Sequence, residues 1–313
     1  MPEWLELASM TDILATTLRL SVPIAFAALG GVLCERSGVW NIGLEGMILA
    51  GAFGAALGVF MTGVPVLGLV TGILCGMLLG LLLAFLSITL GVNQIVSGIA
   101  INLLALGLTA FFARLIFGLD ATTKTLAGFS DWEIPGLSSI PLIGPVFFKE
   151  DPIVYLLFLL VPLIWWILYR TAWGLNIRAT GENPNAADTA GVPVFLVRYA
   201  TVVASGALAA IGGAYIVLAQ VFVFTEHMSA GKGFIALAAI ILGRWDPIGA
   251  VLAAGLFGLC DAVQLRLQFA NPAVPYQIFV ALPYVVSILA LIVFYGRVKP
   301  PAASGIPYRR EAK

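Results

Sequence analysis

The sequence is poor in charged residues. Asp, Glu, Lys and Arg make up 10% of the 313 residues, whereas 61% of the residues are hydrophobic. A water-facing surface needs many more polar side chains than this, which excludes a soluble protein of ordinary composition. Sixteen basic and sixteen acidic residues cancel and no long basic run is present, which argues against nucleic acid as a partner. The composition predicts a protein that lies in a lipid bilayer.

Histidine, paired cysteines and catalytic motifs are also lacking. There is one histidine, His227, and the three cysteines, Cys34, Cys75 and Cys260, lie in or beside apolar runs without paired spacing. We therefore expect no disulfide framework, no zinc site and no haem held by two histidines. The motifs G-x-x-x-x-G-K-[ST], H-E-x-x-H and G-x-S-x-G are absent as well. These absences predict a chain that is not an enzyme, binds no cofactor and does not hydrolyse ATP itself.

Long apolar runs are what the sequence has in quantity. A helix that crosses the hydrocarbon needs about 20 apolar residues, because its backbone groups must bond to one another there. The runs of this length are residues 13–33, 64–90, 95–118, 153–169, 195–219, 248–267 and 276–295. Two shorter runs, 46–61 and 234–243, predict short spans or re-entrant pieces. The expected fold class is all-α: a polytopic transmembrane helical bundle of about eight or nine spans, as one domain over residues 1–313.

A polar island interrupts these runs at residues 174–191, which read GLNIRATGENPNAADTAG. Asn183 is suited to cap a helix, Pro184 to occupy its first position and Gly191 to close it. The pattern predicts a helix of about two turns, which is too short to be stable alone in water. We therefore interpret the island as a docking site for a partner in the cytoplasm.

Lysine and arginine indicate which loops face the cytoplasm, because positively charged loops near the membrane stay on that side. The basic residues that flank the island or lie in the tail are Arg170, Arg198, Arg297, Lys299, Arg309, Arg310 and Lys313. The loop at 119–151 instead holds five acids against two lysines. These patterns predict a cytoplasmic loop at 171–194, a cytoplasmic tail at 297–313 and an extracytoplasmic loop at 119–151. They leave the side of the N-terminus open.

Small residues at four-residue spacing predict helix faces that pack closely, because lipid offers no hydrophobic drive for helix association. Gly68, Gly72, Gly76 and Gly80 form one such stripe. This face could pack within the chain or form a subunit interface.

The two shorter runs open alike, with Glu45-Gly46 in one and Lys232-Gly233 in the other. Transporters are often built from duplicated halves with broken helices near the substrate path. Duplication and chance both explain so short a match.

Charged and amide side chains inside apolar segments are costly, so they usually face a water-filled cavity or a polar partner. The set that could line a passage for a neutral polar solute is Asn41, Glu45, Asn93, Gln94, Asn102, Gln220, Glu226, Lys232, Asp261 and Gln264. For each of them the alternative is a structural role, as an interhelical hydrogen bond or a charge at the membrane interface. Trp40, Phe222 and Phe224 are aromatic residues close to this set in the sequence.

Four strings, taken in order, carry a family resemblance. They are SGVWNIGLEGMILAGAFGA (37–55), NQIVSGIAINLLALGLTAF (93–111), GLNIRATGENPNAADTAG (174–191) and GFIALAAIILGRWDPIGA (233–250). Over about residues 20–295 the chain resembles the membrane permeases of nucleoside and simple-sugar ABC importers, which belong to the branched-chain amino acid and ribose type permease family.

The resemblance implies a permease subunit of a bacterial-type inner membrane that pairs with a second, related permease. It also implies a cytoplasmic ABC ATPase, which uses ATP, and an extracytoplasmic substrate-binding protein. In that setting the island couples ATP hydrolysis to the membrane helices. The coupling residues carried over from the family are Arg178, Gly181, Glu182, Asn183, Pro184, Ala187, Asp188 and Gly191.

The cargo is less strongly determined than the family. The strings NIGLEG and RATGENPNAADTAG are most similar to the nucleoside branch, and net-neutral, amide-lined surroundings suit a nucleoside. The same architecture carrying simple sugars or branched-chain amino acids stays open. An ion-coupled secondary transporter with Asp261 or Glu45 as ion ligands also stays open, although it leaves the island unexplained. A purely structural subunit would not need the amides.

Overall fold

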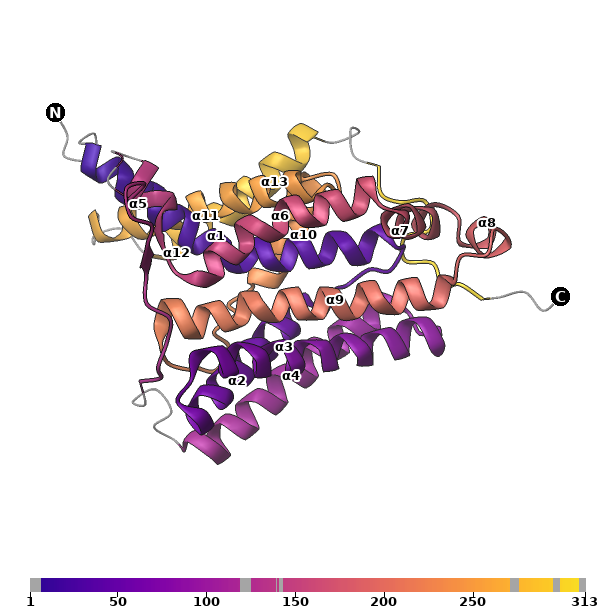
Figure 1. Ribbon diagram of the computed structural model, residues 1–313, viewed down its shortest axis with the longest axis horizontal. Helices are drawn as coiled ribbons and strands as arrows, with labels where there is room; N and C mark the ends of the chain where they lie inside the picture. The colour runs from indigo at the N-terminus through magenta and orange to yellow at the C-terminus, as the bar shows by residue number, and fades with distance from the viewer. Residues whose placement is uncertain are drawn as a thin grey trace.

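The structure is a computed structural model that describes residues 7–118, 125–138, 140, 143–270, 276–294 and 299–309. Its regular structure is almost entirely helical (Figure 1). In chain order the helices are α1 (Leu7–Arg36), α2 (Leu44–Thr62), α3 (Pro65–Ala84), α4 (Gln94–Phe117), α5 (Ile143–Phe147), α6 (Pro152–Arg170), α7 (Ala172–Glu182), α8 (Pro184–Thr189), α9 (Val194–Tyr215), α10 (Lys232–Leu242), α11 (Pro247–Ala270), α12 (Tyr276–Val280) and α13 (Leu282–Phe294). The π-helical turns η2 (Phe85–Thr89) and η4 (Ile216–Val221) continue α3 and α9, and β1 (Trp132–Glu133) pairs antiparallel with β2 (Lys149–Glu150).

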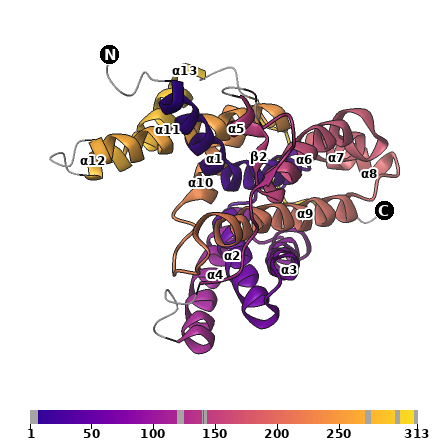
Figure 2. The ribbon, with the colours of Figure 1, turned by 60° about the vertical axis from the view of Figure 1, so that its left-hand side comes forward.

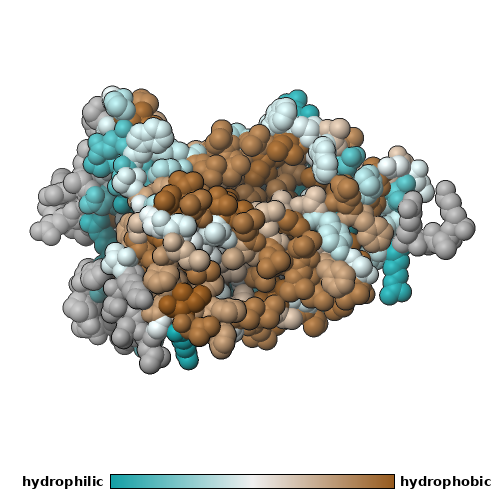
Figure 3. Space-filling view, turned by 60° about the horizontal axis from the view of Figure 1, so that its bottom comes forward, coloured by the Kyte–Doolittle hydropathy of each residue, from teal (hydrophilic) through white to brown (hydrophobic). Residues whose placement is uncertain are grey.

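The predicted polytopic helical bundle is confirmed. Seven helices of the described residues are long and apolar enough to cross a membrane: α1, α2, α3 with η2, α4, α6, α9 with η4, and α11. The short run at 46–61 lies in α2, whose 19 residues suffice, whereas the run at 234–243 lies in α10, which has only 11. Figure 3 shows the corresponding surface, with a broad hydrophobic belt between two hydrophilic ends.

One predicted span is divided in the structure. Residues 276–294 form two helices, α12 and α13, that meet at Ala281 instead of one continuous helix. Pro283 gives the physical reason, because it lacks a backbone N–H and restricts the residue before it. Residue 295, the last of the predicted run, lies outside the described residues.

Helices α1, α2 and α9 form the centre of the bundle. Between 72% and 78% of the residues in their most apolar windows are buried, against 28% to 39% in the other spans. Helix α9 packs on α1, α2 and α3, and in Figure 1 it runs between α1 on one side and α2 to α4 on the other. These helices are apolar on all faces, which is the pattern of a helix surrounded by protein.

The glycine stripe of α3 packs inside the chain. Gly68, Gly72, Gly76 and Gly80 are all buried, and α3 lies against α2 and α9. A Cβ at Gly76 would collide with the carbonyl oxygen of Gly206 in α9, so the two backbones touch where side chains are missing. Of the two interpretations left open by the sequence, packing within the chain is the one observed for this face.

The two ends of the bundle carry different segments. Helices α7 and α8 and the end of the described tail lie at one end, and α5, β2 and the start of α1 lie at the other (Figure 1). Figure 2 shows the same separation from a second direction, with α7 and α8 far from α12 and the start of α1. The polar island and the tail are therefore on one side of the hydrophobic belt, opposite the described part of the loop at 119–151.

An ion pair between the half-exposed Arg19 and the buried Glu150 fastens that loop to α1. The Nε of Arg19 donates to Oε2 of Glu150 at 3.0 Å, and its Nη2 lies 3.5 Å from Oδ2 of Asp131. Glu150 is fully buried, and burial raises the pKa of its carboxyl to about 7, although Arg19 opposes the rise. Because this pKa lies above the unfolded value, the carboxyl contributes less to stability as the pH rises from about 4.5 to about 7.

We predict that Arg19→Met destabilises the protein by about 1 to 3 kcal/mol at about pH 8 and by clearly less at about pH 5.5, because the half-exposed Arg19 is partly screened by solvent. At the higher pH the variant leaves a buried, unpaired carboxylate, whereas at the lower pH the carboxyl is protonated. Thermal unfolding of the purified protein in detergent at the two pH values measures the difference. Lys149→Met is the matched control, because Lys149 and its partner Glu133 are both exposed. An Arg19→Met loss independent of pH would contradict the assignment.

Candidate functional site

The chain turns back into the bundle after α1. The segment 37–43 is not helical and runs along α9: Arg198 Nε donates to the carbonyl of Ser37 at 3.2 Å, and Asn41 Nδ2 donates to Oγ of Ser205 at 2.8 Å. Arg198 and Ser205 are separated along α9 by about 10 Å. Helix α2 therefore begins inside the bundle, after a re-entrant segment.

A second re-entrant segment arrives from the opposite end. Residues 222–231 leave η4 and lead to the start of α10. Phe222, His227 and Ala230 have left-handed backbones, with φ of 59°, 61° and 47°. Residues other than glycine adopt this conformation at a cost, and such strain is concentrated at functional sites. The strained residues lie in the segment directly before α10, so the start of this helix is a candidate functional site.

Glu45 joins the two re-entrant segments. Its carboxylate oxygens accept hydrogen bonds from the backbone N–H groups of Gly231 and Gly233, both at 2.7 Å. The free N–H groups and the dipole of a helix N-terminus favour a negative charge at this position. A Cβ at Gly233 would collide with the backbone of Glu45, so only glycine permits the contact. The two helix starts that resemble each other in sequence thus meet in space.

The amides of α4 support the first re-entrant segment. Asn102 accepts from the backbone N–H of Gly46 at 2.8 Å and donates to the carbonyl of Ile42 at 2.9 Å. Gln94 accepts from the backbone N–H of Trp40 at 2.8 Å. Non-helical backbone inside a bilayer needs such partners. The structural interpretation therefore accounts for these two residues and for Asn41.

Three more of the residues predicted to line a passage lie away from the contact between Glu45 and the start of α10. Asn93 is the N-cap of α4, and its side chain accepts from backbone N–H groups of the first turn. Gln220 donates to the carbonyl of Arg19 at 2.7 Å. Glu226 pairs with Arg114 at 2.7 Å, and the side chains are 34% and 63% exposed. Caps and interfacial ion pairs explain these positions without a passage.

The remaining predicted residues line two cavities beside the start of α10, and Ala230 borders both. The first has a volume of about 280 Å³, and its polar lining residues are Lys232, Asp261, Gln264 and Tyr284. The second has a volume of about 340 Å³, and its polar lining residues are Glu45, Asn102, His227 and Ser229. Lys232 and Asp261 attract each other electrostatically, so the first cavity holds compensated charge. The two cavities form the candidate translocation site.

The three aromatic residues that lie close to the predicted set in the sequence, Trp40, Phe222 and Phe224, do not line the two cavities. Phe224 is buried against Phe53, with ring centroids 5.5 Å apart, and Trp40 packs on Gly305. The cavities are lined instead by Phe234 and Tyr284. Tyr284 lies in α13, far from the predicted set in sequence, so only the fold brings it to the site.

Ser229 was missed, whereas His227 belongs to the polar cluster that the sequence places before the second short run, together with Gln220, Glu226 and Lys232. Both residues precede α10 in the second re-entrant segment and line the second cavity. Ser229 could have been found from its place between His227 and Gly231.

The polar island contains two helices where the sequence predicts one. The predicted two-turn helix is confirmed as α8: Asn183 Oδ1 accepts from the N–H of Ala186 at 3.0 Å, Pro184 occupies the first position, and Gly191 has φ of 87°. Residues before Asn183 form α7, whose start is capped by Thr171. The island is thus a helical pair at the end of the bundle (Figure 1).

The eight predicted coupling residues divide by burial. Glu182, Asn183 and Gly191 are exposed, Arg178, Pro184 and Asp188 are half-buried, and Gly181 and Ala187 are buried. A Cβ at Gly181 would collide with the carbonyl of Arg36, so this glycine lets α7 touch the end of α1. The exposed residues form a surface that a partner can reach, and the buried ones join that surface to the bundle.

Apolar spans interrupted by two re-entrant segments, with paired polar groups where these meet, are the features of a membrane transport protein. The chain matches, over residues 13–295, the family model described as "Branched-chain amino acid transport system / permease component". It therefore belongs to this family of permeases, and it is a multi-pass protein of the plasma membrane.

Individual relatives match along almost the whole chain. The guanosine ABC transporter permease protein NupQ of Bacillus subtilis is 40% identical over 308 residues, which cover 96% of this chain and 97% of the relative. The nucleoside ABC transporter permease protein NupC of Lactococcus lactis is 37% identical, with 95% and 96% covered. The putative glucose ABC transporter permease protein TsgC13 of Haloferax volcanii is 41% identical over 260 residues, with 82% and 78% covered.

We predict that Glu45→Gln lowers the free energy of unfolding by about 1.5 to 3 kcal/mol. The amide has one acceptor oxygen in place of two, and its NH₂ group would face a backbone N–H of α10. Thermal unfolding in detergent measures the loss. Glu226→Gln is the matched control, because the same substitution there alters only an exposed ion pair. Equal shifts in the two variants would mean that the contact between Glu45 and α10 is not important for stability.

Proposed function

We propose that this chain is the permease subunit of an ABC importer and forms, with a second related permease, the translocation path for nucleosides. The observation that carries the proposal is the end-to-end match to two permeases that are named for guanosine and nucleoside transport. A cytoplasmic ABC ATPase supplies the energy from ATP, and this chain binds no cofactor of its own. An extracytoplasmic binding protein delivers the cargo.

The proposed ATPase contact is the surface of α7 and α8. Basic residues gather at this end of the bundle, which is typical of the cytoplasmic side. Arg36 ends α1, Arg170 ends α6 just before α7, Arg178 lies in α7, and Arg36 bonds to the carbonyl of Arg244. The loop at 125–150 then faces outward, where the binding protein docks. This orientation agrees with the proposed cytoplasmic tail, because the described tail lies at the same end as α8.

Contacts at this end give a route for movement from α7 into the membrane. Gly181 touches the backbone of Arg36, and Arg36 Nε donates to the carbonyl of Trp245 at 2.7 Å. The indole N–H of Trp245 donates to the buried carboxylate of Glu35 at 2.5 Å. A displacement of α7 by the ATPase would therefore move α1 and the turn between α10 and α11.

The charge of the candidate site favours a neutral cargo. Lys232 and Asp261 compensate each other, and the carboxylate of Glu45 is already bonded to two backbone N–H groups. No fixed charge of one sign is left for an ionic solute among these three residues. Amides and hydroxyls suit the ribose of a nucleoside, and Phe234 and Tyr284 offer surfaces for a base. A simple sugar is the second candidate, because the glucose-named relative is 41% identical.

We predict that the purified importer in proteoliposomes takes up labelled guanosine only when ATP is supplied. Unlabelled nucleosides should compete with the label and glucose should not, because glucose lacks the base that the aromatic residues bind. Uptake should persist when ion gradients are collapsed with ionophores. Competition by glucose alone would transfer the assignment to sugars, and uptake driven by an ion gradient without ATP would refute the ABC mechanism.

We predict that Asn185→Cys, at the exposed tip of α8, is captured by a short cysteine-directed crosslinker on the ATPase subunit. Ser130→Cys is the matched control, since Ser130 is equally exposed but lies in the loop at the opposite end. Cys34 and Cys260 are buried, and the half-buried Cys75 is replaced by Ser in both variants to keep the background low. Capture of the ATPase from Ser130→Cys but not from Asn185→Cys would reverse the proposed orientation.

A further inference from the structure

The described tail, residues 299–309, forms a C-terminal strap across the end of the bundle that carries α7 and α8 (Figure 1). The backbone N–H of Ala303 donates to the carbonyl of Gly181 at 2.8 Å. Two residues further on, the N–H of Gly305 donates to the carbonyl of Gly38 at 3.1 Å. The strap therefore bonds to the last turn of α7 and to the first re-entrant segment at once.

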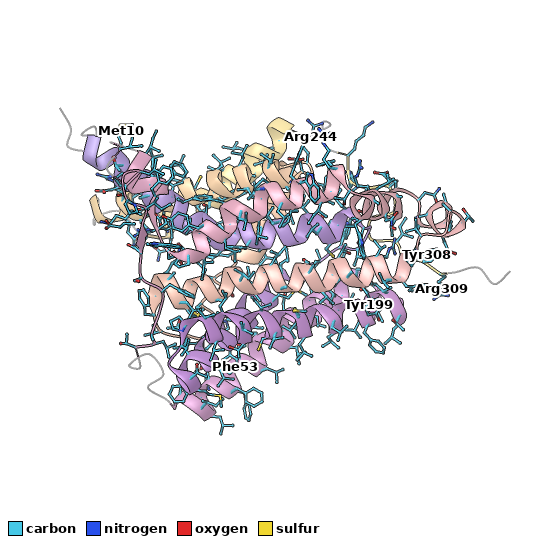
Figure 4. All side chains as sticks on the ribbon, viewed as in Figure 1. Met10, Phe53, Tyr199, Arg244, Tyr308 and Arg309 are labelled. Atoms are coloured by element: carbon cyan, nitrogen blue, oxygen red, sulfur yellow. The ribbon has the colours of Figure 1, made fainter. Side chains whose placement is uncertain are left out.

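The far end of the strap is anchored by an aromatic side chain. Tyr308 is buried with Ala187 of α8 and Val194 of α9, and its ring centroid lies 5.5 Å from that of Phe195. Figure 4 labels Tyr308 and Arg309 at this end of the molecule. The anchor holds the strap to α8 as well as to α7.

Arg198 joins the strap to the first re-entrant segment. Its side chain is 1% exposed, and Nε donates to the carbonyl of Ser37 while Nη1 donates to the carbonyl of Ile306 at 3.1 Å. A guanidinium can hold two carbonyls in a fixed fork, whereas a lysine ammonium acts as a single point. The relative position of strap and segment is thus set by one planar group.

The contact between strap and bundle is polar and incompletely bonded. Within the described part of the chain, Thr180 Oγ1, Arg198 Nη2 and Ser304 Oγ are buried and have no hydrogen-bond partner. The residues that carry these unpaired atoms lie close to Gly38, which is surrounded by Arg198, Ala303 and Gly181. A contact of this kind holds less firmly than close-packed apolar side chains, so it can rearrange at low cost.

We propose that Arg198 and the C-terminal strap are positioning elements of energy coupling, which pass a displacement of α7 and α8 to segment 37–43. From there the displacement reaches the hydrogen bonds of Glu45 with the start of α10, beside the two cavities. The inference rests on the proposed function, because it assumes that a partner ATPase moves α7 and α8. Helix α7 already contacts α1 directly. The strap is a second connection, and it leads to the candidate translocation site.

The test compares two truncations of the chain in the full importer. One ends at Pro300 and removes strap residues 301–309, which include all of its contacts described above, and the other ends at Arg309 and keeps the strap. ATP hydrolysis stimulated by the binding protein and cargo uptake are measured in the same proteoliposomes. For the shorter chain we expect hydrolysis close to that of the intact complex and uptake lower by about tenfold or more. The longer truncation should match the intact complex in both.

Arg198→Lys is the second variant, and it tests the role in energy coupling if the shorter chain fails to assemble. It keeps the positive charge but cannot hold the carbonyls of Ser37 and Ile306 together, so it should also raise the ATP consumed per solute transported. A parallel loss of uptake and hydrolysis would show a merely structural role and overturn the inference, as would no loss of either. The ratio is measured with whichever cargo the intact complex transports. A wild-type complex without ATP-dependent uptake would instead refute the proposed function.

Discussion

The structure depends on one carboxylate held inside an apolar bundle. Glu45 lies where two re-entrant segments meet, and both of its oxygens are bonded to backbone N–H groups of residues that open α10. An ionised group away from water is tolerated only when it is paired and hydrogen-bonded. The N-terminus of a helix supplies both the donors and the positive end of a dipole. Glu45 therefore fixes where α10 begins, and the start of α10 defines the two cavities.

Local sequence signals correctly predicted the features that depend on neighbouring residues alone, such as helix α8. Asn183, Pro184 and Gly191 specify α8 through cap, first position and end, and the prediction was confirmed because every contact lies within a few residues. Apolar length predicted the spans equally well. The division at Ala281 was missed, although Pro283 is visible in the sequence, because hydrophobicity alone does not reveal a break. Helix α7 was missed although Thr171, a residue type that caps helices, precedes it in the sequence.

The polar residues show where single-sequence reasoning stops. Asn41 and Gln94 looked like the lining of a passage, yet they bond to Ser205 of α9 and to the first re-entrant segment. Asn102 bonds to that segment as well, and it also lines the second cavity. A sequence displays side chains but not the unpaired backbone groups that a re-entrant segment creates, so it cannot separate these roles. Tyr284 and Arg198 were missed for the same reason, since their partners lie far away in the chain.

Re-entrant backbone also constrains how the protein can move. Every N–H and carbonyl of segment 37–43 that leaves one partner within the bilayer must find another, because no bulk water is available there. Intermediate positions with broken bonds are costly, so the segment favours a few discrete arrangements over a continuous range. At the end of the bundle with Arg198 and the strap, buried polar atoms of the described residues are already unpaired, so a change of arrangement there has fewer hydrogen bonds to break. A force applied to α7 and α8 would therefore act on this polar contact as well as on α1, and through the contact on Glu45.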